Sequence, residues 1–198
     1  MDMTNNYLDK TESGAILVKK PFFKDNRGSF FTPWNEDLSN EICKAEGLPG
    51  LKFVQDNESV SSKGTIRGLH FQKGAYSQAK LVRVSRGAVI DFIVDLRLTS
   101  KTFGQLEKFY LDEENKHMLF VPRGFAHGFI SLANNTTFQY KVDNAYAPKE
   151  EAGINLSEWI RFLEGTEAED LLGSLVLSEK DKHWPTLAEA REAGLCYI

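Results

Sequence analysis

The central part of the chain consists of short segments in which residue types alternate along the backbone, and this pattern limits the fold more than any other feature. The clearest segment runs from Ala88 to Leu96. Four of its apolar side chains fall on one face, namely Ile90, Phe92, Val94 and Leu96. A period of two is that of a β-strand. Similar segments from Leu51 to about Val142 are separated by Gly64, Gly74, Gly87, Gly104 and Gly124. Many short strands bounded by glycines predict a mainly β barrel or sandwich.

Helices are expected on either side of this central part. Asn35 is placed to cap a short helix that ends at Gly47. Thr186 followed by Glu189 is a capping-box pattern, which predicts a last helix that ends near Gly194. The fold class expected from residues alone is therefore a β core with peripheral helices.

The length of 198 residues suits one domain with a sizeable core. We therefore expect residues 1–198 to form a single domain. Residues 1–13 are polar and are expected to be a flexible tail. Residues from about 155 to 198 are expected to form a C-terminal helical segment, including the acidic stretch 161–174.

Composition excludes several classes of protein. The net charge of −4 gives no electrostatic footprint for nucleic acid. Cys43 and Cys196 are the only cysteines and lie far apart, so we expect neither a disulfide framework nor a zinc site. The segment Met1–Gly14 lacks the apolar stretch of a signal peptide, and no run reaches transmembrane length. These features predict a cytoplasmic protein without membrane contacts.

Polar side chains stand among residues that are otherwise typical of a core. Four of them are Gln55, Arg67, His70 and His127. Strand alternation places Arg67 and Leu69 on one side, and Gly68 and His70 on the other. A glycine within a strand often marks the close approach of a ligand or of another backbone segment. The pattern indicates a polar pocket inside an apolar shell.

Four sequence blocks together resemble the dTDP-4-dehydrorhamnose 3,5-epimerase family. The blocks are 25–30, 53–57, 67–72 and 122–129. Shorter matches lie between and after them in the family's order, at 80–84, 94–97, 102–104, 140–141 and 146–148. The resemblance covers roughly residues 22–154. It implies a cupin jelly roll (a double-stranded β-helix) with short peripheral and C-terminal helices, and an isomerase that works as a homodimer without a cofactor.

The resemblance also implies four catalytic residues. His70 would be the general base, oriented by Asp181, and Tyr140 would be the acid that acts on the opposite face of the sugar. Lys80 would stabilise the enolate. Each residue also has a purely structural interpretation. His70 and Tyr140 fit core positions, Asp181 fits a helix-capping pair with Ser178, and Lys80 fits the exposed start of a strand.

Further residues are implied as contacts of a nucleotide-diphosphate sugar. They are Arg27, Phe30, Gln55, Asn57, Arg67, His127, Tyr146, Glu151 and Lys180. The arginines suit a diphosphate because their planar forks donate several hydrogen bonds. No metal is expected, because the His-x-His pair common in cupins is missing: position 68 is Gly and position 72 is Gln.

The activity implied is epimerisation of dTDP-4-dehydro-6-deoxyglucose at C3 and C5 to dTDP-4-dehydro-L-rhamnose. Two alternatives stay open: an epimerase of one centre or of another nucleotide-linked 4-keto sugar, and a non-catalytic sugar-nucleotide binding cupin. The chain departs from the family's pattern at Thr32 and over residues 155–177. The apolar run Ala15–Val18 is expected to join the partner's sheet in the homodimer.

Overall fold

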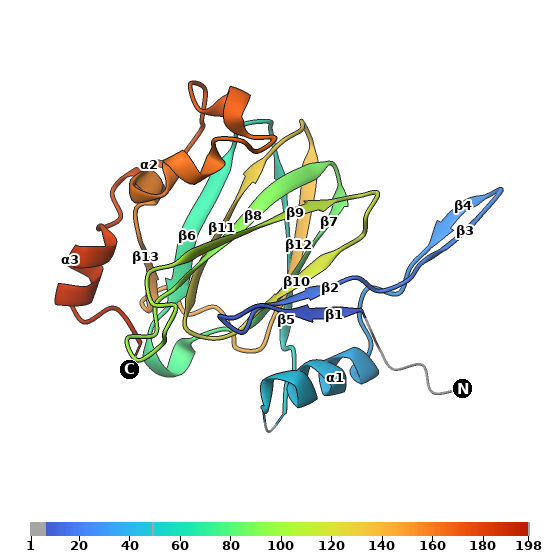
Figure 1. Cartoon of the computed structure of the whole chain (residues 1–198), viewed down its shortest axis with the longest axis horizontal. Coiled ribbons are helices and arrows are strands. Elements are labelled where there is room, and N and C mark those ends of the chain that lie inside the picture. Colours follow the sequence, from blue (N-terminus) through green and yellow to red (C-terminus); the bar gives the residue numbers. More distant parts are fainter. Residues whose placement is uncertain (1–6, 49, 198) are drawn as a thin grey trace.

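Two antiparallel β-sheets pack face to face in the computed structural model, which describes residues 7–48 and 50–197. The six-stranded sheet has the order β1 (Leu8–Lys10), β2 (Ile16–Val18), β10 (Met118–Val121), β7 (Lys80–Arg86), β12 (Thr136–Val142) and β5 (Gln55–Ser61). The five-stranded sheet has the order β13 (Glu151–Gly153), β6 (Ile66–Gln72), β11 (Phe125–Ser131), β8 (Ala88–Asp95) and β9 (Leu106–Asp112). Figure 1 shows the two sheets at the centre of the molecule. This mainly β arrangement confirms the predicted jelly roll.

The apolar side chains of the strands form three buried clusters, one between the two sheets and one on the outer face of each sheet. Val89 and Ile93 of β8 lie in the core between the two sheets, together with Phe138 of β12. Ile90 and Phe92, on the other face of β8, pack beneath the C-terminal segment. The predicted alternation in this strand is confirmed, and both of its faces are apolar because both are covered.

The first predicted helix is confirmed as α1 (Glu36–Glu46). The Asn35 side chain accepts a hydrogen bond from the Leu38 N–H, and Gly47 ends the helix in the left-handed conformation with φ 66°. Leu38 and Ile42 pack on β2, β7 and β10, at the outer face of the six-stranded sheet. This helix therefore covers part of that sheet.

The C-terminal segment covers the outer face of the five-stranded sheet. The last helix, α3 (Leu187–Glu192), begins with the predicted capping box of Thr186 and Glu189. The short helix α2 is Glu179–Lys182. The stretch 161–174 differs from the helix expected there, because it contains only 3-10 turns, of which the last is Glu169–Leu171. In the part of the chain that the structure describes, no helix is long and apolar enough to cross a membrane.

The N-terminal strands correct two expectations. Residues 8–10, expected in a flexible tail, form β1, and residues 1–6 of that tail lie outside the described residues. The run Ala15–Val18, expected to join a partner's sheet, contributes β2, which pairs with β1 and β10 of its own chain. Ile16 and Val18 are fully buried within the single chain. This run therefore leaves no exposed apolar patch of its own.

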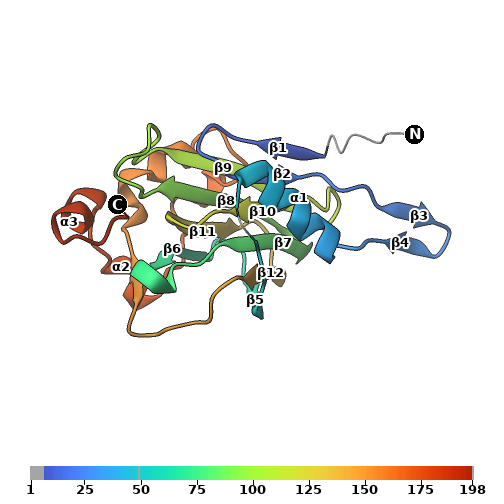
Figure 2. The same ribbon diagram turned by 90° about the horizontal axis from the view of Figure 1, so that it is seen from below.

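A two-stranded hairpin projects from the body of the molecule instead. It consists of β3 (Phe23–Asp25) and β4 (Gly28–Phe30), and both views show it extending away from the sheets on the side opposite α3 (Figures 1 and 2). Phe23 is 72% exposed and Phe30 is 69% exposed. These two aromatic residues pair at the base of the hairpin, where it leaves the body of the molecule. They are an unusual apolar exposure for a folded chain.

Candidate active site

A cavity of about 650 Å³ opens between the two sheets. Its walls come from β5, β6, β7, β11 and β12, and from residues 176–181 of the C-terminal segment. All four residues considered as catalytic line it, together with three of the expected binding residues. These seven are His70, Lys80, Tyr140, Asp181, Arg67, His127 and Lys180. The fold thus gathers side chains from distant parts of the sequence into one cavity.

An irregularity at Gly68 brings Arg67 and His70 to the same cavity. Simple alternation placed them on opposite sides of the strand, and this expectation is wrong. The register between β6 and β11 shifts between His127 and Phe129, so the alternation is interrupted there. Gly68 has φ 123°, and an added Cβ would lie 2.6 Å from the His127 carbonyl oxygen. The close approach expected at this glycine is therefore that of the β11 backbone.

His70 and Asp181 form a hydrogen-bonded pair. The His70 Nε2 lies 2.5 Å from Asp181 Oδ1, which also accepts a hydrogen bond from the Trp184 indole at 3.2 Å. Burial alone would raise the pKa of Asp181, but these hydrogen bonds and the His70 ring outweigh it and hold that pKa below its usual value. An ionised Asp181 keeps the proton on the ring nitrogen that it contacts, so the other ring nitrogen is the free base.

Asp181 takes part in a helix cap and also contacts His70. Its backbone N–H donates to the Ser178 hydroxyl at 3.1 Å, which caps α2. Its carboxylate is then free to face His70, and the side chain is 4% exposed. The cap fixes the position of the backbone from which the carboxylate reaches the histidine.

Lys80 lies inside the cavity instead of on the surface. It begins β7 and makes no side-chain hydrogen bond or ion pair with any residue in the described part of the chain. Burial lowers the pKa of Lys80 to about 8, although the charges of Asp91 and Glu151 act in the opposite direction. A lysine with this pKa is mainly cationic at neutral pH. It offers an unpaired positive charge to a developing anion.

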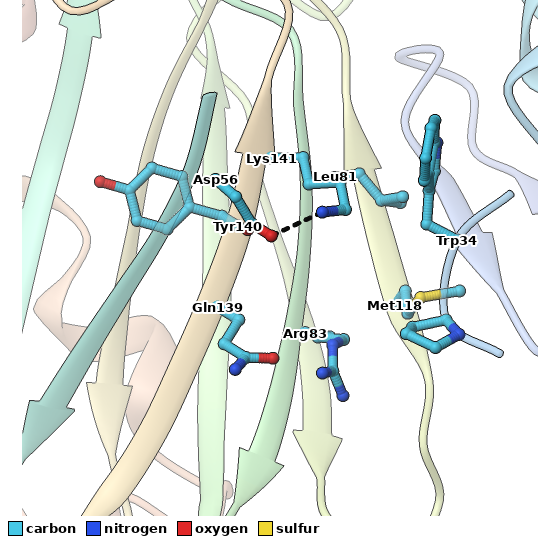
Figure 3. A pocket seen from close by; sticks show the side chains of 9 residues that line it. Trp34, Asp56, Leu81, Arg83, Met118, Gln139, Tyr140 and Lys141 are labelled. Carbon is cyan, nitrogen blue, oxygen red and sulfur yellow. Dashed lines mark hydrogen bonds and ion pairs between the residues drawn. The ribbon is translucent and has the colours of Figure 1, made fainter. Parts of the chain in front are cut away.

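Tyr140, like Lys80, faces the cavity from the six-stranded sheet, opposite the sheet that carries His70. Burial raises the pKa of its phenol above the usual value, so the hydroxyl keeps its proton and can donate it. On the other side of β12 lies a second, smaller cavity of about 220 Å³, and Tyr140 borders both cavities. Figure 3 shows this smaller cavity, with the Tyr140 ring extending away from Leu81 and Arg83. The phenol therefore belongs to the larger cavity.

Asp91 is a residue that the sequence analysis did not single out. It is fully buried and accepts hydrogen bonds from His127 Nε2, at 2.9 Å to Oδ2 and 3.1 Å to Oδ1. Burial raises the pKa of Asp91 and lowers that of His127. The sequence did contain a signal for this site: Asp91 shares a strand face with the apolar residues Val89 and Ile93. A carboxylate at such a position predicts a buried partner, because charged side chains are rarely fully buried without one.

Four of the other expected binding residues form a hydrogen-bonded chain with Lys180 near the cavity. The Gln55 amide donates to Asn57 at 2.7 Å, and its oxygen accepts from the Tyr146 backbone N–H at 3.2 Å. The Tyr146 hydroxyl donates to Glu151 at 2.7 Å, and Glu151 also pairs with Lys180 at 2.6 Å. These five residues therefore support one another, and Lys180 brings the chain to the cavity wall.

Arg27 and Phe30 stand apart from the other site residues. Both lie on the projecting β3–β4 hairpin and neither lines the cavity of their own chain. The Arg27 side chain pairs with Asp25 on the same hairpin, with 2.6 Å between Nη2 and Oδ2.

Among the described residues, no group of three or more His, Cys, Asp and Glu side chains is arranged to hold a metal ion. The cations Arg67, Lys80 and Lys180 all line the cavity, which suits an anionic ligand. His70 and Tyr140 line this cavity from the two facing sheets. A cavity of this kind, inside a cupin jelly roll, is that of a cupin-fold isomerase.

Comparison with known proteins identifies the family. The chain belongs to the dTDP-4-dehydrorhamnose 3,5-epimerase family, whose sequence model matches residues 10–189. The enzyme of that name from Escherichia coli K12 is 41% identical over 181 residues, which are 91% of this chain and 94% of the relative.

Solved structures agree with this assignment. One is dTDP-6-deoxy-D-glucose-3,5-epimerase from Legionella pneumophila in complex with dTDP-4-keto-L-rhamnose. It is 34% identical, with a TM-score of 0.81, over 96% of this chain and 97% of that one. Another is ChmJ, a 3'-monoepimerase from Streptomyces bikiniensis in complex with dTDP-quinovose. It is 28% identical, with a TM-score of 0.81, over 96% and 92% of the two chains.

Proposed function

We propose that this protein converts dTDP-4-dehydro-6-deoxyglucose to dTDP-4-dehydro-L-rhamnose by inverting C3 and C5. The observation that carries the proposal is the facing pair of proton-transfer groups in one cavity. His70, paired with Asp181, comes from the five-stranded sheet, and Tyr140 comes from the six-stranded sheet. Inversion needs this division, because a proton that leaves and returns on one face restores the original configuration.

The first half of the reaction is removal of a proton next to the C4 ketone. The free ring nitrogen of His70 takes the proton from C3 or C5, and the C–H electron pair moves to form an enolate with its charge on the C4 oxygen. Asp181 stabilises the imidazolium that results. Lys80 stabilises the enolate oxygen, since it carries an unpaired positive charge in a partly desolvated cavity.

The second half is return of a proton to the opposite face. The Tyr140 phenol donates its proton to carbon, and the enolate collapses back to the ketone. The imidazolium and the phenolate that remain exchange one proton through solvent, which restores both groups. The same cycle then acts on the other carbon, so the net reaction consumes no cofactor.

The nucleotide is bound by cations and by the hydrogen-bonded chain near the cavity. Arg67 lines the cavity, and its guanidinium can donate to a diphosphate while its Nε remains bonded to Ser61. Lys180 adds a second positive charge at the wall, supported by Glu151. Gln55, Asn57, Tyr146 and His127 complete the binding set in this proposal.

A homodimer is part of the proposal. The β3–β4 hairpin would reach the cavity of the partner subunit and bring Arg27 and Phe30 to the nucleotide. This is supported by the exposure of Phe23 and Phe30, by the absence of hairpin residues from the lining of their own chain's cavity, and by the projection of the hairpin away from the sheets (Figures 1 and 2). Location in the cytoplasm and independence from metals also belong to the proposal.

Solvent exchange tests the proposed reaction. The protein is incubated with dTDP-4-dehydro-6-deoxyglucose in deuterated water, and deuterium at C3 and C5 is followed by NMR. Incorporation at both carbons with formation of the L-rhamnose product is expected. Incorporation at only one carbon would make the protein a single-centre epimerase, and binding without incorporation would make it a non-catalytic binding protein.

A further inference from the structure

The inward face of β5 carries a row of polar side chains, one of which is left without a hydrogen bond among residues 7–48 and 50–197. Gln55 bonds to Asn57 at 2.7 Å, and Ser61 accepts a hydrogen bond from Arg67 Nε at 3.1 Å. Ser59, between these pairs, has a buried hydroxyl oxygen that makes no hydrogen bond to any residue in the described part of the chain. Its side chain belongs to the wall of the 650 Å³ cavity.

A buried hydroxyl without a partner is unfavourable, so such groups in native proteins call for an explanation. Packing does not explain the serine at position 59. Alanine would fill nearly the same space and would leave no hydroxyl without a hydrogen bond. The serine side chain can turn about a single bond between staggered positions, and the cavity lies next to it. A ligand in the cavity can therefore provide the missing partner.

The position of Ser59 indicates which part of the ligand it meets. On one side, Asn57 lies opposite Tyr140 in the register of β5 and β12, and the phenol acts on the sugar. On the other side, Ser61 holds Arg67. Ser59 itself lies opposite Phe138, midway along β5 between Asn57 and Ser61. In a nucleotide sugar, the diphosphate joins the sugar to the nucleoside.

We infer that Ser59 is a substrate-binding residue whose hydroxyl donates a hydrogen bond to a phosphate oxygen of the nucleotide diphosphate, beside Arg67. This inference rests on the proposed function. The Ser59 hydroxyl and the Arg67 guanidinium lie near each other on the cavity wall, and both can donate hydrogen bonds to a doubly charged diphosphate. Because the hydroxyl makes no hydrogen bond within the described chain, no internal hydrogen bond there is lost when the ligand binds.

Calorimetric titration with dTDP, which lacks the sugar, tests the inference. For Ser59→Ala we expect about a tenfold weaker Kd, as for loss of one hydrogen bond to a charged group. The matched control is Ser62→Ala, because Ser62 is exposed and lies outside the cavity wall. The control should bind dTDP as the parent does. The Tm of Ser59→Ala should equal or exceed that of the parent, since no internal hydrogen bond is removed.

Several results would overturn the inference. A Kd of Ser59→Ala within twofold of the parent would show that the hydroxyl does not contact the nucleotide. A loss seen only as a higher KM for the complete substrate, with dTDP binding unchanged, would move the contact to the sugar. A clearly lower Tm would make Ser59 a structural residue. Failure of the parent itself to bind dTDP would instead contradict the proposed function.

Discussion

Replacement of Lys80 by methionine should remove activity and at the same time stabilise the fold. Methionine has a similar length and no charge, so it keeps the packing while removing the buried cation. The pKa of Lys80 falls from 10.5 to about 8 on folding, mainly through burial. At 1.36 kcal/mol for each pH unit, the protonated lysine costs the folded state about 3 kcal/mol. Because the cavity is open to water, we expect Lys80→Met to gain about 1 to 3 kcal/mol at pH 7.

The pH dependence of this gain has a definite sign. Below about pH 8 Lys80 is protonated in both the folded and the unfolded chain, and the full cost is present. Between about pH 8 and 10.5 the unfolded chain holds a proton that the folded chain has released, so the stability of the parent rises with pH relative to the variant. The difference between the two proteins should therefore close near pH 10.5.

Urea denaturation of the parent and Lys80→Met at pH 7 and at pH 10 measures both quantities. Lys101→Met is the matched control, since Lys101 is exposed, and we expect it to change the free energy of unfolding by less than about 0.5 kcal/mol. Turnover of Lys80→Met should be lost at every pH, and turnover of the parent should decline above about pH 8. A Lys80→Met variant that is less stable than the parent at pH 7 would refute the argument from desolvation.

Three further predictions follow from the site. His70→Asn should lower turnover by about a hundred- to ten-thousand-fold while dTDP binding stays within a few-fold, because the base acts on the sugar; activity close to that of the parent would remove His70 from the mechanism. Treatment with a strong chelator should leave the rate unchanged, and restoration of a lost rate by zinc or iron would contradict the metal-free proposal. Phe30→Asp should weaken both the dimer and the activity, since Phe30 is 69% exposed in the single chain; a fully active monomer in sedimentation would exclude a contribution from the hairpin.

Local patterns in the sequence predicted those parts of the fold that depend on neighbouring residues. The capping of α1 by Asn35 and Gly47, the capping box at Thr186 and the alternation within β8 are all present. Each depends on contacts within one element or on one covered surface. Such features can be read without knowing which distant segment lies nearby.

Features that depend on distant contacts were missed or misplaced. The shared orientation of Arg67 and His70 follows from the register of β6 against β11, which alternation within β6 alone does not reveal. The run Ala15–Val18 pairs with β10, far along the chain, so its apolar character suited a partner's sheet equally well. In the stretch 161–174, a 3-10 turn ends at Leu163, Glu164 is extended with ψ 138°, and Gly165 follows with φ 70°, so the backbone does not continue as a helix.

In the candidate site too, the sequence indicated which residues to consider but not the surroundings that distant contacts give them. The family resemblance pointed to His70, Lys80, Tyr140 and Asp181, and the structure brings them to one cavity. Their surroundings were not predictable from sequence, since the depressed pKa of Lys80 comes from burial among several strands. The roles of these residues remain predictions until they are tested by substitution.

The central claim is that His70 and Tyr140 act on opposite faces of the sugar, and Tyr140→Phe tests it most directly. The variant keeps the aromatic ring and removes only the proton that is to be delivered. In deuterated water with dTDP-4-dehydro-6-deoxyglucose, NMR should show exchange at C3 or C5 catalysed by His70, with little or no inverted product. Normal inversion by Tyr140→Phe would contradict the claim and would make Tyr146, whose hydroxyl donates to Glu151, the next acid to substitute.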